Sequence, residues 1–241
     1  MTTITQGNRD VSEAIYAANT KFQEEYSAKI PALSLLNNLG WRYVSPDEAL
    51  KQRAGKPDEV VLREVLRQEL SKRRFEFEGK THALSATSID KLITQLCSPV
   101  LNEGLLAANE TLYNHMVYGI AVTEFVNGNK ATPTIAIIDW HNIDNNDFCY
   151  TEEMVVSRAN GIDHRKPDIV CFVNGLPWFV SEAKRLVAEE QKGLMEKEGI
   201  SHIIRNIEVD DMNRLFAYSQ FLFSINGLEV RYDRSRMSAT F

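Results

Sequence analysis

The stretch KPDIVCFVNGLPWFVSEAKR, residues 166–185, reads as two short apolar strands joined by a tight turn. An acid, Asp168, opens the first strand, and Glu182 and Lys184 close the second. Because side chains alternate along a strand, Glu182 and Lys184 share one face of the hairpin. The hairpin therefore gathers charged side chains at one end of an otherwise apolar unit.

The length of the turn decides whether Asp168 joins that face. A three-residue loop sets Asp168 directly opposite Glu182. A two-residue turn instead pairs Asp168 with Ser181 and directs Glu182 to the opposite face. We expect the three-residue loop, over residues 174–176, because only that register brings the two carboxylates together.

Two carboxylates and an ammonium group at one sheet margin suit the hydrolysis of a phosphodiester. Carboxylate oxygens are the ligands that Mg²⁺ prefers, and the ion keeps other positions for water and substrate phosphate. The bound metal would activate water and stabilise negative charge on the phosphate, and a nearby lysine adds to that effect. We therefore expect Asp168, Glu182 and Lys184 to be catalytic. The alternative is a set of charged residues at an exposed strand end.

The rest of the chain predicts an α+β fold of α/β/α type, a mixed, largely antiparallel sheet flanked by helices. Residues 60–70 and 88–96 have apolar side chains at helical spacing, the second behind a Ser88 cap. Further segments are rich in β-branched and aromatic residues and read as strands, over residues 117–129, 132–140 and 147–158. After the hairpin, a helix is expected over 212–224 and a short strand over 228–233.

This order predicts a single domain over residues 1–241. A mainly helical elaboration covers 1–110, a core covers 111–232, and a tail covers 233–241.

Composition limits the possible partners and the compartment. The 241 residues carry a formal charge of -6, which disfavours nucleic-acid binding by bulk charge, and the basic stretch 63–74 reads as a solvated helix face. Cys97, Cys149 and Cys171 lack the spacing of metal ligands, which indicates buried, reduced thiols and a cytoplasmic protein. No apolar run approaches the roughly 18 residues of a membrane span.

Two resemblances, one of a short motif and one of most of the chain, make the predicted reaction more specific. Pro167-Asp168 followed by Glu182-x-Lys184 resembles the motif of PD-(D/E)xK nucleases. In order, LNNLGWRY, the hairpin and GISHIIRNIEVDDMNRLFAYSQFLFSINGLEVRY are similar to the N-terminal nuclease region of the restriction (R) subunit of type I restriction-modification enzymes. The resemblance covers residues 33–232. The same Glu-x-Lys spacing at Glu78 and Glu190 lacks both an upstream Asp and this longer similarity.

The resemblance implies a Mg²⁺-dependent endodeoxyribonuclease acting on double-stranded DNA, with Mn²⁺ as the alternative ion. Asp168 and Glu182 would be metal ligands, the carbonyl of Ala183 a third ligand, and Lys184 the catalytic lysine. Other residues would contact DNA: Lys166, Arg185, Arg214 and Tyr218.

The chain departs from the family pattern at the following helix. Relatives often carry Gln-x-x-x-Tyr there, and Arg214 stands in place of the Gln before Tyr218. Either Arg214 contacts DNA phosphate or this helix only packs in the core. The family also places an acid on an early helix, where Glu24 and Glu25 are both available and neither is assigned.

No Gly-x-x-x-x-Gly-Lys-Ser/Thr motif is present, so we expect no ATP site in this chain. ATP-driven translocation and docking to the modification and specificity subunits would belong to the complete assembly. The last residues, RSRMSATF, lie near where the motor begins in the family, which suggests an isolated or truncated nuclease domain. The alternatives are a stand-alone repair or recombination nuclease and a non-catalytic docking module.

Overall fold

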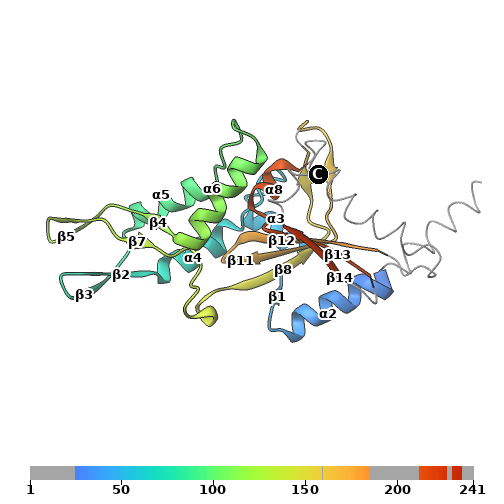
Figure 1. Ribbon diagram of the computed structural model, residues 1–241, viewed down its shortest axis with the longest axis horizontal. Coiled ribbons are helices and arrows are strands. Elements are labelled where there is room, and N and C mark those ends of the chain that lie inside the picture. The colour runs from blue at the N-terminus through green and yellow to red at the C-terminus, as the bar shows by residue number, and fades with distance from the viewer. Residues whose placement is uncertain (1–24, 159, 185–211, 227–229, 235–241) are drawn as a thin grey trace, which may run out of the picture.

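A mixed six-stranded sheet forms the centre of the molecule (Figure 1). The computed structural model describes residues 25–158, 160–184, 212–226 and 230–234. β1 is parallel to β8 and β12 is parallel to β13, whereas the other neighbours are antiparallel. The predicted fold class is confirmed. The strand order is β1 (Arg42–Tyr43), β8 (Phe148–Glu152), β11 (Ile169–Val173), β12 (Leu176–Ala183), β13 (Phe221–Ile225) and β14 (Val230–Arg234).

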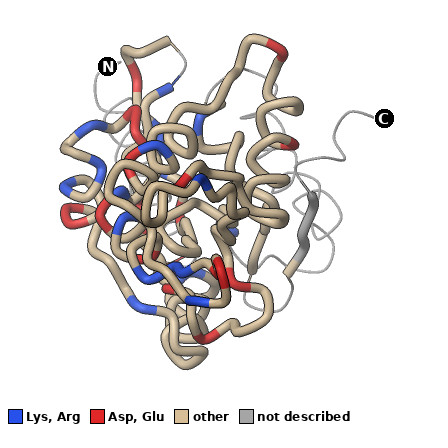
Figure 2. The backbone as a smooth tube through the Cα atoms, turned by 90° about the vertical axis from the view of Figure 1, so that its left-hand side faces the viewer, with Lys and Arg blue, Asp and Glu red and all other residues tan. Residues whose placement is uncertain are grey.

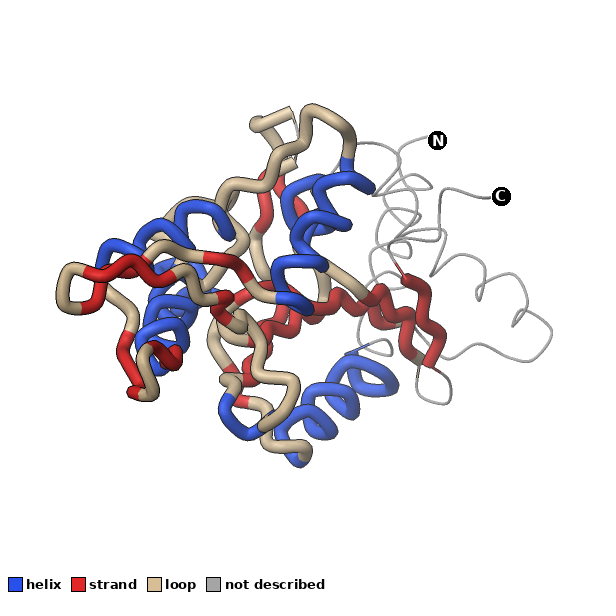
Figure 3. The backbone as a smooth tube through the Cα atoms, turned by 60° about the vertical axis from the view of Figure 1, so that its left-hand side comes forward, coloured by secondary structure: helices blue, strands red, loops and turns tan. Residues whose placement is uncertain are grey.

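Helices cover both faces of this sheet (Figures 1 and 3). On one face, Val170, Phe172 and Val180 belong to the larger hydrophobic core. That core is closed by α3 (Pro46–Gln52), α4 (Arg63–Lys72), α5 (Ala86–Leu96), α6 (Leu105–Tyr118) and α8 (Asn213–Tyr218). On the other face, Ile169 and Cys171 pack in a second core under the π-helical turn η1 (Glu25–Lys29) and α2 (Ile30–Asn38). The helical first part of the chain therefore shares its cores with the sheet.

Four small hairpins or strand pairs lie outside the main sheet. They are β2 (Arg74–Phe77) with β3 (Lys80–Ala83), β4 (Ile120–Ala121) with β7 (Thr134–Ile135), β5 (Glu124–Val126) with β6 (Asn129–Ala131), and β9 (Val156–Ser157) with β10 (His164–Arg165). Parts of the predicted strand regions 117–129 and 132–140 therefore form strands that pair only locally, whereas Val117 and Tyr118 are the end of α6. A 3-10 turn, η2 (Ile143–Asn145), precedes β8.

Two sequence predictions about helix ends are wrong. The N-cap of α5 is Ser85, whose hydroxyl accepts the backbone N–H of Ser88 at 3.2 Å, so Ser88 is not the cap. The helix predicted over 212–224 ends at Tyr218. There, the backbone N–H of Gln220 donates to the carbonyl of Trp178 at 2.8 Å, which directs the chain into β13 beside β12.

The β11–β12 hairpin has a two-residue turn, so the predicted loop of three residues is wrong. Val173 pairs with Leu176 across that turn. A β-bulge follows, in which Trp178 is the extra residue of β12, and beyond it Ile169 pairs with Ser181. Continuing this register sets Asp168 opposite Glu182. The bulge thus gives the predicted opposition of the two acids by a different route.

No helix among the described residues is long and apolar enough to span a membrane.

Candidate active site

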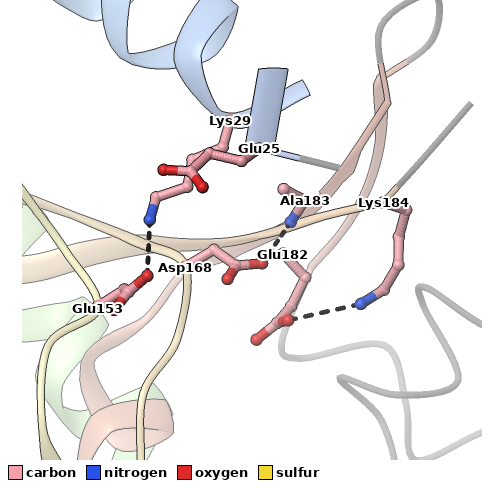
Figure 4. A pocket seen from close by; sticks show the side chains of 7 residues that line it. All are labelled: Glu25, Lys29, Glu153, Asp168, Glu182, Ala183 and Lys184. Carbon is pink, nitrogen blue, oxygen red and sulfur yellow. Dashed lines mark hydrogen bonds and ion pairs between the residues drawn. The ribbon is translucent and has the colours of Figure 1, made fainter. Parts of the chain in front are cut away.

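The charged ends of the hairpin open into a pocket of about 200 Å³ (Figure 4). Four parts of the fold meet there: η1, the end of β8, the residue preceding β11, and the end of β12. The lining residues are Glu25, Lys29, Glu153, Asp168, Glu182, Ala183 and Lys184. The three predicted catalytic residues therefore lie in one pocket.

Asp168 is held in place by backbone groups on both sides. Its Oδ2 accepts the N–H of Ala183 at 2.7 Å, across the hairpin. Its own carbonyl accepts the N–H of Glu153 at 3.1 Å. The carboxylate is only partly buried, so it is oriented toward the pocket without being sealed from solvent.

Glu182 in β12 and Lys184, which directly follows that strand, extend into the same pocket (Figure 4). Their side chains form a loose ion pair, with Lys184 Nζ 3.7 Å from Glu182 Oε2. The Glu182 side chain is 15% exposed and that of Lys184 is 28% exposed. The backbone N–H of Lys184 donates to the carbonyl of Ile225 at 2.7 Å, which anchors this end of β12 on β13. Both side chains are thus positioned on an ordered strand end.

A second lysine lies on the opposite side of the pocket. Lys29 Nζ is 2.8 Å from Glu152 Oε2 and 2.9 Å from Glu153 Oε1, and only 8% of its side chain is exposed. Burial opposes the charge, but hydrogen bonds and the charges of Glu152 and Glu153 raise the pKa of Lys29 above its ordinary value. Lys29 is therefore a firmly held cation beside the predicted catalytic acids.

Glu25 is the acid from the early part of the chain that the structure brings to the pocket. Glu24 lies outside the described residues. The approach depends on η1 packing against the sheet, where Ala28 joins Ala183 in the second hydrophobic core. Nothing in the local sequence indicates that contact, so neither Glu25 nor Lys29 could be assigned from the sequence.

The donor set fits a hard divalent cation that keeps water ligands. In the described part of the chain, no three His, Cys, Asp or Glu side chains form a ready metal cluster. The pocket therefore does not provide the four protein ligands of a closed zinc site. A pair of carboxylates beside Ala183 suits Mg²⁺, which is usually bound through one or two carboxylates.

Of the four residues predicted to contact DNA, one lies just before the hairpin, one lies outside the described residues, and two are bonded elsewhere in the fold. Lys166 is exposed and lies two positions before Asp168, and Arg185 lies outside the described residues. Arg214 Nη2 instead donates to Glu59 Oε1 at 3.1 Å and to the carbonyl of Cys97 at 2.8 Å.

Tyr218 is fully buried, and its hydroxyl donates to the carbonyl of Leu96 at 2.6 Å. Burial raises the pKa of this phenol. Neither Tyr218 nor Arg214 lines the pocket. Tyr218 therefore packs in the core, where its phenol has no surface that DNA could reach. The Arg214 side chain is 31% exposed, and its contact with DNA phosphate stays a prediction.

The basic stretch 63–74 is largely paired with acids. Arg63 Nη2 lies 3.1 Å from Glu59 and Arg67 Nη1 lies 2.7 Å from Asp90. Figure 2 shows Lys and Arg interspersed with Asp and Glu at this end of the molecule. The stretch is consistent with a solvated helix face.

Comparison with known proteins gives consistent matches. Residues 21–236 match the family described as the type I restriction enzyme R protein N terminus. The chain is 27% identical over 220 residues to the putative type I restriction enzyme MjaIXP endonuclease subunit of Methanocaldococcus jannaschii, covering 88% of this chain and 19% of that protein. It is 26% identical over 205 residues to the HindI endonuclease subunit of Haemophilus influenzae, covering 83% and 18%. The chain spans about a fifth of the length of these relatives.

Proposed function

The chain belongs to the family of type I restriction enzyme R protein N-terminal regions, and from this premise we propose that it is a Mg²⁺-dependent DNA endonuclease domain. Its centre is the pocket that holds Asp168, Glu182 and Lys184. The observation that carries the proposal is the hairpin register, in which a bulge sets Asp168 opposite Glu182. The substrate is double-stranded DNA, and the reaction is hydrolysis of a phosphodiester bond.

Each residue of the pocket has a distinct role in this proposal. Asp168 and Glu182 hold the ion, and the carbonyl of Ala183 is the third protein ligand. When bound, Mg²⁺ supplies positive charge at the scissile phosphate and makes a water molecule more acidic. The N–H of Ala183 fixes Asp168 in its ligating orientation. Lys184, whose side chain is 28% exposed in the pocket, orients the attacking water and offsets charge on the phosphate.

Two further contacts belong to the same proposal. Lys166 and Arg185 flank the hairpin in the sequence and bind DNA phosphates on either side of the cleaved bond. Glu25, which faces the pocket from η1, accepts hydrogen bonds from water at the metal.

The longer assembly is also part of the proposal. The relatives are named as subunits of restriction enzymes and are about five times longer than the matched region. We assign to this chain the nuclease step alone. Docking to modification and specificity subunits and ATP-driven movement along DNA belong to the longer protein and its complex.

A plasmid-nicking assay with Mg²⁺ tests the nuclease centre. Asp168→Asn, Glu182→Gln and Lys184→Met should each lower the nicking rate by about 100-fold or more. Asp168→Asn retains an oxygen that can accept the N–H of Ala183, so the fold should be preserved.

The chain supplies matched controls for this assay. Glu78 and Lys80 have the same Glu-x-Lys spacing on the exposed β2–β3 turn, away from the pocket. Glu78→Gln and Lys80→Met should leave the rate within about twofold, as expected for surface changes away from the site. If the wild-type chain cleaves neither alone nor within the complete restriction complex, the docking-module alternative replaces this proposal.

A further inference from the structure

The pocket has an unbalanced set of charges. Four carboxylates and two ammonium groups line it, which gives a formal charge of -2. The two ammonium groups differ in exposure, since the side chain of Lys184 is 28% exposed, whereas that of Lys29 is 8% exposed and lies within 2.9 Å of two carboxylates. One side of the pocket therefore has a buried cation held by two acids.

The side that contains Lys29 adjoins the predicted metal ligands. Glu153, whose carboxylate accepts a hydrogen bond from the Lys29 ammonium group, has a left-handed backbone conformation with φ of 44°. Its N–H donates to the carbonyl of Asp168. A non-glycine residue in this conformation is held there by its surroundings, and here the Lys29 contact and the Asp168 bond both hold it.

Several acidic side chains around one pocket are the setting in which hydrolytic enzymes hold two metal ions about 3.5–4 Å apart. Glu153 lines this pocket and Glu152 adjoins it in the sequence, and the position between their carboxylates is already filled by the Lys29 ammonium group at 2.8 and 2.9 Å. A second divalent ion would have to displace that group or lie next to a like charge, and both are unfavourable.

We propose that Lys29 takes the place of a second metal ion, so that the pocket binds one divalent cation, at Asp168 and Glu182. This inference rests on the proposed function, because it presupposes the first ion. It assigns Lys29 the role of a positioning residue. Lys29 neutralises Glu153, which lines the pocket, together with the neighbouring Glu152, and keeps the Glu153–Asp168 contact in place.

Counting bound Mn²⁺ tests the inference without any measurement of cleavage. Calorimetric titration, with free Mn²⁺ followed by its paramagnetic resonance signal, should give one ion per wild-type chain. Lys29→Gln should bind two, because Glu152 and Glu153 lose their cation. Two controls should bind one: Lys29→Arg, which retains the charge, and Lys29→Gln combined with Glu152→Gln, which removes a carboxylate together with the ammonium group.

The outcomes separate this inference from the proposed function. No ion in the wild type would contradict the proposed metal centre. One ion in both the wild type and Lys29→Gln, or two in the wild type, would overturn the role of Lys29 alone.

Loss of a buried ion-pair partner destabilises a protein strongly, so folding of Lys29→Gln is followed by circular dichroism. If the variant is unfolded in metal-free buffer, Mn²⁺ should restore the native spectrum, because the second ion replaces the lost cation. Failure of Mn²⁺ to restore it would overturn the inference.

Discussion

At the scale of single residues, Tyr218 and Lys184 differ in what surrounds their polar atoms. The Lys184 ammonium group is partly exposed in a charged pocket, whereas the Tyr218 hydroxyl donates to the carbonyl of Leu96 inside the core. A residue at a family motif position can therefore stabilise the fold without contacting the substrate.

Tyr218→Phe should consequently affect stability and not cleavage. The change leaves the buried carbonyl of Leu96 without this hydrogen-bond donor, which costs about 1–2 kcal/mol. Urea denaturation should show that loss, and the nicking rate and DNA affinity of the folded variant should equal those of the wild type. Weaker DNA binding with unchanged stability would indicate instead that Tyr218 contacts DNA.

The buried thiol of Cys97 gives a prediction about pH. Burial raises the pKa of Cys97 from an ordinary value of 9.0 to about 11. The unfolded chain thus loses this proton first, so the free energy of unfolding contributed by Cys97 should decrease between about pH 9 and pH 11. Denaturation across this range should show a smaller decrease for Cys97→Ala than for the wild type. Equal slopes would mean that the thiol is not buried.

At the scale of elements, helix α4 supports the hairpin that carries the site. The backbone N–H of Leu62, at the start of α4, donates to the carbonyl of Gly175 in the turn at 2.8 Å. Gly175 has a φ of 81°, and a Cβ there would lie 2.5 Å from the carbonyl oxygen of Leu62. The turn therefore requires glycine for both conformation and space.

Gly175→Ala should destabilise the protein by about 3 kcal/mol or more, through backbone strain and overpacking together. Gly79 is a matched control, because its φ is 71° and a Cβ added there would have no neighbouring atom within 4 Å. Gly79→Ala should cost only about 1–2 kcal/mol, the strain of a left-handed alanine. Urea denaturation of both variants measures the difference, and equal losses would show that the contact with α4 contributes nothing.

The same hairpin shows what the sequence can and cannot predict. The two apolar runs around a turn predict both strands, and the alternation of side chains along a strand predicts the shared face of Glu182 and Lys184; the structure has both strands and places both side chains in one pocket. Pro177, beside the bulge, is a residue that an inner strand accommodates at such irregularities, but the sequence does not fix Trp178 as the extra residue or the register that follows. The helix predicted after the hairpin stops early for a related reason: pairing of β13 with β12 is a tertiary contact that overrides helical spacing.

At the scale of the whole molecule, the pocket exists only when distant parts of the chain come together. Lys29 and Glu153 are 124 positions apart, and Asp168 and Ala183 are 15 apart. Local patterns could identify the Asp168 hairpin, but they could not choose Glu25 over Glu24 or point to Lys29, because the positions of Glu25 and Lys29 depend on packing of η1 against the sheet. An unfolded chain therefore lacks the arrangement that would bind a metal ion, and binding should favour the folded state.

Mg²⁺ should accordingly stabilise the protein. With few protein ligands and several retained waters, the dissociation constant for the ion alone is expected to be of millimolar order. At about ten times that constant, the free energy of unfolding should rise by about 1.4 kcal/mol, since the ion binds the folded chain only. For a chain of this size, that gain corresponds to an increase in Tm of about 3–6 °C. Differential scanning calorimetry at constant ionic strength, adjusted with KCl, measures this shift.

The Glu182→Gln variant makes this measurement specific to the pocket. It removes a charge that faces the proposed ion and leaves the hydrogen bond between Asp168 and Ala183 intact. Its Tm should therefore stay constant as Mg²⁺ is added, whereas Glu78→Gln should respond as the wild type does. An equal increase in Tm for Glu182→Gln and the wild type would show that Mg²⁺ stabilises the protein by binding elsewhere. Asp168 and Glu182 would then not form the Mg²⁺ site.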